Sequence, residues 1–174
     1  MNRLFRYFIA LCLLRVGPQD LPASPFLFRL ALALNLLVGV VLIGDNFGGP
    51  VRALFAASLD IALLLMWIYA LLAVFGTGTQ RFVQSATALL GGGALTGLLA
   101  LPLEAMNGAV DAGTMLGTLV GGTLLFVMLW SMVVVAHILR HALEIRMGSA
   151  IWMTLVYSVV TTIFIYSLFH VSGS

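Results

Sequence analysis

Charged residues are scarce in this sequence, and their scarcity argues against a soluble protein. Only 8% of the 174 residues are charged and 62% are hydrophobic, whereas soluble domains carry about 25% charged residues. So few charges could not cover a surface that faces water. Lysine is absent, and the net charge of +2 is too small to indicate nucleic-acid binding. We therefore expect one integral membrane domain whose main partner is the lipid bilayer.

Cysteine and catalytic motifs are nearly absent as well. Cys12 is the single cysteine, which excludes an intrachain disulfide and a thiolate metal cluster. The sequence has no Ser/His/Asp arrangement and no phosphate-binding loop. The run GGGALTG at 91–97 is not a dinucleotide fingerprint, because no strand precedes it. We therefore expect a protein that is not an enzyme and needs no cofactor.

Five apolar stretches are long enough to cross a hydrocarbon core of about 30 Å as helices. Pro50 suits the first turn of the second helix, and Pro102 is expected to close the third. The stretches lack the alternation of β-barrel strands. The expected fold class is therefore an all-α polytopic membrane protein with a five-span domain over 26–174. The expected spans are about 26–43, 51–75, 82–103, 113–136 and 149–170, separated by GDNFGGP at 44–50, GTGTQR at 76–81 and EAMNGAVDAG at 104–113.

Residues 1–25 are expected to form an interfacial helix followed by a proline-rich connector. Arg3 and Arg6 precede an apolar core that is too short to span a membrane. No cleavage site of small residues follows directly, which argues against a signal peptide. We expect a helix lying at the cytoplasmic face; the alternative is an uncleaved, partly inserted helix. The extended connector contains Pro18, Pro22 and Pro25.

The arginines favour one orientation in the membrane. With the N-terminus inside, the outer loops hold Arg52 alone, together with the acids Asp45, Glu104 and Asp111. Such a distribution follows the positive-inside rule. We therefore expect a bacterial inner-membrane protein with a periplasmic C-terminus. The cytoplasmic segments then hold the other seven of the eight arginines, Arg3, Arg6, Arg15, Arg29, Arg81, Arg140 and Arg146.

A carboxylate inside the second span is the most unusual feature. Insertion scales give a cost of about 2.5–3.5 kcal/mol for an acid at the centre of a membrane helix. Asn35 and Asp60 are equidistant from the loop that joins the first two spans, so both lie about 12 Å deep. We expect a structural pair in which the Asn35 amide donates to Asp60. The alternatives are a proton or ion pathway, or another partner for Asp60, such as Gln84 or a second subunit.

Glycines mark expected packing faces in the third and fourth spans. Small residues let helix backbones approach closely in lipid, so we expect these two spans to pack tightly against each other. The alternatives are a dimer seam or a broken helix at a functional site. The glycines concerned are Gly91, Gly92, Gly93 and Gly97 in the third span and the ridge Gly113, Gly117 and Gly121 in the fourth.

His137, His141 and Glu144 share one face of a helix, at spacings of four and three residues. Two imidazoles and a carboxylate could hold a metal ion, although Arg140 beside them would oppose a cation. We expect instead that these residues lie at the juxtamembrane end of the fourth helix. That helix would then continue through 137–146.

The sequence resembles the Yip1 family of multi-span membrane proteins. The resemblance covers most of residues 27–170 and is carried by RFVQSATALLGGGALTGLLALPL at 81–103 and LWSMVVVAHILRHALEIRMGSAIWMTLVYSVV at 129–160. It implies five close-set spans and a role in membrane organisation. Eukaryotic members are implicated in vesicle trafficking and contact small GTPases through cytosolic segments. The long cytosolic N-terminal domain of those members is not found here, so no partner residues are carried over.

Two classes of function remain. The first is a non-enzymatic membrane-organising or accessory protein that acts through helix packing and its cytoplasmic face. The second is a small transporter or channel subunit that uses Asp60. A protein partner would be another membrane protein or a second copy of the chain. The two classes differ in whether Asp60 faces a cavity or a sealed helical hairpin.

Overall fold

The computed structural model describes residues 2–44, 46–75 and 81–170, and within these ranges the chain is built of helices and turns. Five of its helices are long and apolar enough to cross a membrane. The expected five spans and short N-terminal helix are confirmed, whereas Asp45, residues 76–80 and residues 171–174 lie outside the described residues. The elements are α1 (Asn2–Cys12), the 3₁₀ helix η1 (Pro18–Asp20), α2 (Pro25–Ile43), α3 (Pro50–Val74), α4 (Phe82–Ala109), α5 (Met115–Leu143) and α6 (Met147–His170).

Local sequence signals explain where the spans begin. The hydroxyl of Ser24 accepts a hydrogen bond from the Leu27 amide, and Pro25 occupies the first turn of α2. Pro50 has the same place in α3. The hydroxyl of Thr114 caps α5 by accepting from the Gly117 amide at 3.0 Å. Proline and hydroxyl caps are favoured there because the first amides of a helix have no partner within it.

The third span is longer than the sequence predicted. Pro102 was expected to close it, but α4 continues through this proline to Ala109, so residues 104–109 are helix rather than connection. Proline removes one backbone hydrogen bond, and membrane helices tolerate that loss where the surroundings compensate. At 28 residues, α4 is about 42 Å long.

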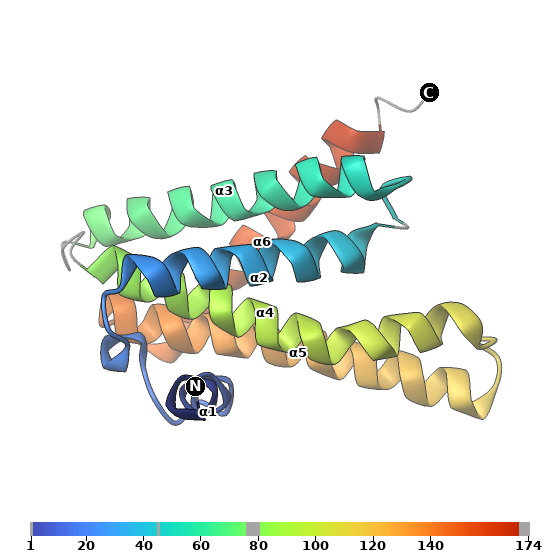
Figure 1. Ribbon diagram of the computed structural model, residues 1–174, viewed down its shortest axis with the longest axis horizontal. Helices are drawn as coiled ribbons and strands as arrows, with labels where there is room; N and C mark the ends of the chain where they lie inside the picture. The colour runs from blue at the N-terminus through green and yellow to red at the C-terminus, as the bar shows by residue number, and fades with distance from the viewer. Residues whose placement is uncertain (1, 45, 76–80, 171–174) are drawn as a thin grey trace.

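Helix α4 is the central element of the bundle. It contacts α1, α2, α3 and α5, and 44% of its most apolar stretch is buried, against 17–22% in the other spans. Figure 1 shows the five spans running along the long axis, with α6 crossing behind α2 and α3. We call the end where α4 and α6 begin the inner end, and the end that carries the α2–α3 and α4–α5 connections the outer end.

The glycines of α4 make room for three different neighbours. A Cβ on Gly91 would overlap the Phe8 ring of α1, and one on Gly97 would lie 2.5 Å from Val38 of α2. Gly93 also faces α2, because a Cβ there would overlap the side-chain amide of Asn35. Only Gly92 faces α5, at ordinary contact distance from Val134. Helices α4 and α5 do pack against each other as expected, but the α4 glycines mainly make room for α1 and α2.

The ridge expected in the fourth span is also divided. Gly113 precedes α5, and a Cβ there would meet nothing within 4 Å. Gly117 lies against the backbone of Asp111 in the preceding connection, and Gly121 faces Asn107 of α4 at 4.0 Å. The regular spacing therefore does not form one continuous α4–α5 seam, because its first member lies outside the helix and its second packs on a turn.

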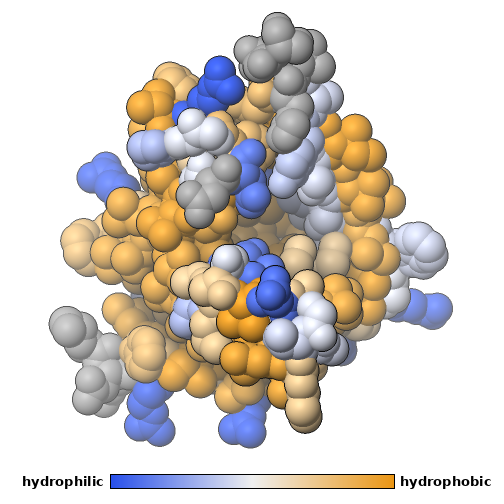
Figure 2. Space-filling view, turned by 90° about the vertical axis from the view of Figure 1, so that its right-hand side faces the viewer, coloured by the Kyte–Doolittle hydropathy of each residue, from blue (hydrophilic) through white to orange (hydrophobic). Residues whose placement is uncertain are grey.

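The flanks of the bundle are apolar. Figure 2, which views the outer end, shows hydrophobic residues over most of the visible surface. Large exposed apolar side chains occur on every span, including Leu37, Phe55, Leu125 and Ile163. Such a surface would be costly in water and suits contact with lipid. The structure therefore describes an integral membrane protein.

Candidate functional site

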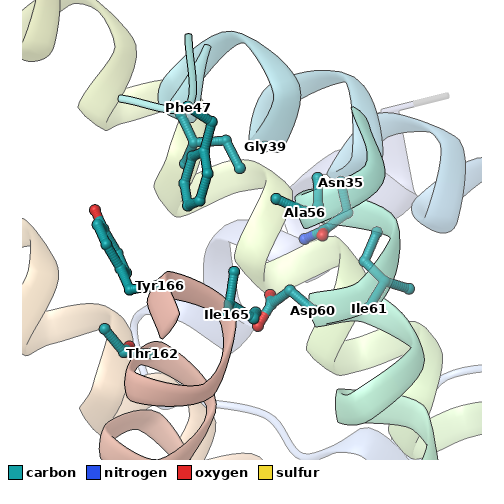
Figure 3. Close-up of a pocket in the computed structure, with 11 residues that line it drawn as sticks. Asn35, Gly39, Phe47, Ala56, Asp60, Ile61, Thr162, Ile165 and Tyr166 are labelled. Carbon is teal, nitrogen blue, oxygen red and sulfur yellow. The ribbon is translucent and has the colours of Figure 1, made fainter. Parts of the chain in front are cut away.

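Asp60 opens into a slot between α2, α3 and α6. The slot has a volume of about 190 Å³, and the Asp60 side chain is exposed. Figure 3 shows the carboxylate reaching from α3 toward Ile165 of α6. Within the described part of the chain, no hydrogen bond or ion pair engages the carboxylate oxygens. Asp60 therefore faces a cavity and not a sealed hairpin.

Asn35 lines the same slot but has a different hydrogen-bond partner from the one expected. Its side-chain amide donates to the Leu90 carbonyl of α4 at 3.0 Å. Equal distance from a loop fixes the depth of two residues but not the direction in which each side chain points. Gly93, whose missing side chain leaves room for the Asn35 amide, makes the approach to α4 possible. The amide thus joins α2 to α4, and the two polar residues share a cavity without bonding to each other.

The slot runs from the outer end of the bundle down to these two polar side chains. On α2 its lining follows one helical stripe, from Ile43 through Gly39 to Asn35. Phe47, in the α2–α3 connection, and Tyr166, on α6, lie toward the outer end, with ring centroids 5.3 Å apart (Figure 3). The slot therefore has an aromatic outer part, an apolar wall and a polar deep end.

Aromatic residues close the seam between α3 and α6 beside Asp60. The Tyr157 hydroxyl donates to the main-chain carbonyl of Asp60 at 3.4 Å. Its ring stacks on Trp67 with centroids 4.4 Å apart. These contacts hold α6 against α3 on the inner side of Asp60.

A second constellation surrounds residues 12–21, and we call it the N-terminal clamp. Side chains from the spans donate to backbone carbonyls of this segment: Trp130 to Cys12 at 2.9 Å and Gln84 to Leu21 at 2.6 Å. The His137 ring contacts the Val16 carbonyl at 3.1 Å, which requires the protonated ring nitrogen to face it. Gln84, considered as a partner for Asp60, is thus engaged in the clamp.

The clamp also completes the C-terminal end of α1. The last four carbonyls of a helix lack partners within it. Here three accept from the amides of Leu13, Leu14 and Arg15, and the fourth, that of Cys12, accepts from Trp130. Leu14 adopts a left-handed conformation with φ of 60°, which is uncommon for a residue other than glycine. Its surroundings therefore fix the chain in this turn.

Burial changes the acidity of two groups at the clamp. It raises the pKa of the Cys12 thiol from 9.0 to about 11. The pKa of Tyr7 is also raised, first by burial and then by the Asp20 carboxylate. The Tyr7 hydroxyl donates to the Gly17 carbonyl at 2.6 Å, and the Gly17 amide donates to Asp20 at 3.1 Å. The Cys12 thiol and the Tyr7 hydroxyl are therefore both protonated at neutral pH.

Helix α1 has a buried face, an exposed apolar stripe and, beyond that stripe, an exposed arginine. Leu11 and Cys12 are buried against the bundle, and Figure 1 shows α1 end-on while the spans run across the view. Phe5, Ile9 and the following Leu13 lie four residues apart on a second stripe, with exposed fractions of 61%, 37% and 50%. Exposed Arg6 lies beyond this stripe. A helix held crosswise with an exposed apolar stripe is suited to a membrane interface.

Two of the three residues weighed as metal ligands lie together, and the third has another partner. His137 is buried in the clamp, and its ring lies 4.6 Å from that of His141. Glu144 is the C-terminal cap of α5 and forms an ion pair with Arg81 at 2.6 Å. Among the described residues, no group of three side chains is arranged to hold a metal. The fourth helix extends beyond the expected span, but α5 ends at Leu143, three residues short of the expected 146.

Sequence reasoning gave Gln84 and His137 other roles and did not single out Trp130. A partly buried indole N–H normally has a hydrogen-bond partner, and that is the signal that could have pointed to Trp130. Comparisons with protein-family models, curated proteins and solved structures find no match for the chain.

Proposed function

We propose that this is a non-enzymatic membrane-organising protein in which α1 acts as a fixed apolar wedge in the cytoplasmic leaflet. The observation that carries the proposal is the clamp. Trp130, His137 and Gln84 engage the backbone that follows α1, so the helix cannot swing freely from the bundle. Its exposed stripe is thereby held in one orientation relative to the spans.

A fixed wedge would affect lipid packing on one side of the membrane. Apolar side chains that enter the boundary between headgroups and acyl chains bind in a curvature-sensitive way. Arg6 and Arg15 are exposed nearby and would attract anionic headgroups. The proposed orientation, with the N-terminus in the cytoplasm of a bacterial cell, is supported by the arginine distribution of the sequence. The resemblance to the Yip1 family points to the same class of role.

The test is sorting between flat and curved membrane. The protein, fluorescently labelled, would be reconstituted into giant vesicles from which narrow tubes are pulled, with α1 on the outer leaflet. We expect enrichment on the tubes that the double variant Phe5→Ser/Ile9→Ser abolishes. Phe26→Ser is the matched control, because Phe26 is 74% exposed near the same end of the bundle but lies on α2. Equal sorting of the double variant and the wild type would refute the proposal.

A small transporter or channel subunit is the second candidate. The observation that favours it is that Asp60 lines a cavity instead of pairing with Asn35. A transport role predicts that Asp60→Asn folds and inserts normally but reproduces the phenotype of a deletion. A wild-type phenotype for Asp60→Asn would exclude this candidate.

A further inference from the structure

We propose that the slot between α2, α3 and α6 is a binding site for a small alkylammonium ion. The ammonium group lies against Asp60 and the alkyl chain extends along the apolar wall toward the outer end. This site is separate from α1 and the clamp, so the inference is independent of the membrane-organising role.

Charge is the first argument. Asp60 lies ten residues after Pro50 in α3, which places it about 15 Å along the helix. In the described residues the ion pair present joins Arg81 to Glu144 at the inner end, far from the slot. A carboxylate at this depth is stabilised by a cation that enters with it. Among the described residues that line the slot, Asp60 is a negative group and none is a cation that would neutralise it.

The lining decides which kind of cation fits. Calcium takes six to eight oxygen ligands, and magnesium requires a near-octahedral set. Here Asp60 is joined by the Asn35 side-chain oxygen, which is the acceptor left after its amide donates to Leu90. These two groups provide too few oxygen ligands for a divalent ion without bound water. They suit an ammonium group, which needs a charge partner and two or three hydrogen-bond acceptors.

The rest of the slot suits a short apolar chain. Ile43, Ala56 and Ile165 form its wall, and Phe47 and Tyr166 lie toward its outer end. The volume of about 190 Å³ exceeds by about an order of magnitude the roughly 10–15 Å³ of cavity volume that one water molecule needs. An alkylammonium with a few carbons fills that space. Aromatic faces along the route also attract ammonium ions.

The experiment measures thermal unfolding of the purified protein in a non-ionic detergent. The probes are butylammonium chloride, 1-butanol as the neutral isostere, and sodium chloride at matched ionic strength. We expect butylammonium to raise the unfolding temperature saturably by about 2–4 °C, because a ligand that binds only the folded state stabilises it. No saturable shift with butylammonium, or an equal shift with 1-butanol or sodium chloride, would overturn the proposal.

Three variants locate the binding. Asp60→Asn removes the charge, and Thr162→Phe fills the slot from α6 while keeping Asp60. Both should abolish the butylammonium shift. Ile163→Phe is the matched control, because Ile163 is the adjacent, 64% exposed residue of α6 and does not line the slot. A shift retained in Asp60→Asn or Thr162→Phe, or lost in Ile163→Phe, would place binding elsewhere and refute the assignment.

Discussion

At the inner half of the bundle, side chains of α4 and α5 close on the backbone of residues 12–21, whereas at the outer half α3 and α6 leave a slot between them. The inner half satisfies carbonyls of an irregular segment with Trp130, His137 and Gln84. The outer half leaves the Asp60 carboxylate in a cavity. Polar groups thus lock one region and line an opening in the other, so substitutions should affect the two regions very differently.

Truncating a buried side chain at the inner half should have the largest effect. Leu11 is 0% exposed where α1 meets the bundle, and Leu11→Ala should lower the free energy of unfolding by about 2–5 kcal/mol. The measurement is SDS-induced unfolding in mixed micelles. Leu168→Ala is the control, because Leu168 is 50% exposed on α6 at the outer half. Equal costs for the two variants would remove the contrast between the regions.

Removing a clamp hydrogen bond should have the next largest effect. Trp130→Phe keeps an aromatic ring but leaves the Cys12 carbonyl without its donor, which should cost about 1–3 kcal/mol. Phe126→Leu is the control, because Phe126 stacks on Trp130 but is 63% exposed. If Trp130→Phe is no less stable than the control, the clamp contributes little to stability.

The single cysteine reports whether the clamp is closed. Because burial raises the pKa of Cys12 to about 11, its thiolate fraction at pH 8 is about two orders of magnitude below that of an ordinary thiol. Alkylation by iodoacetamide should therefore be slow at pH 8 and accelerate as the pH rises toward 11. In Trp130→Phe the rate at pH 8 should increase. A wild-type rate equal to that of a free thiol would mean that α1 detaches readily.

A double-mutant cycle at the outer half should show a small and additive effect. Asp60→Ala and Asn35→Ala should add within about 0.3–0.5 kcal/mol, because Asn35 bonds to Leu90 and not to Asp60. Asn35→Ala should cost about 0.6 kcal/mol, the mean for hydrogen bonds between membrane helices. A coupling well above 0.5 kcal/mol would restore the direct pair that sequence reasoning favoured.

The exposed ion pair should contribute least. Arg81 and Glu144 have side chains that are 43% and 65% exposed, so Arg81→Gln should cost at most about 1 kcal/mol. The cost should shrink in high salt, because salt screens exposed charges. Arg146→Gln at the same end of the bundle serves as the control. A cost that is large and insensitive to salt would show that this pair belongs to the clamp.

The sequence could predict the spans because hydropathy adds up over about twenty residues. A single residue carries less information, as Pro102 shows: one lost hydrogen bond did not end α4. Depth arithmetic placed Asn35 and Asp60 at one level, and the structure shows that both line one slot. The arithmetic could not fix the rotation of α2 that turns Asn35 toward Leu90. The clamp was hidden for another reason: its acceptors are backbone carbonyls, which every residue has.

Spin-label accessibility tests most directly whether α1 is a fixed wedge at the membrane interface. In a Cys12→Ala background, single labels would be placed at Phe5→Cys, Ile9→Cys and Arg6→Cys in liposomes, and collisions with oxygen and with a water-soluble nickel complex would be compared. We predict that oxygen dominates at positions 5 and 9, on the apolar stripe, and that nickel dominates at position 6. Three labels that are equally accessible to nickel would show that α1 lies free in water, and would contradict the account.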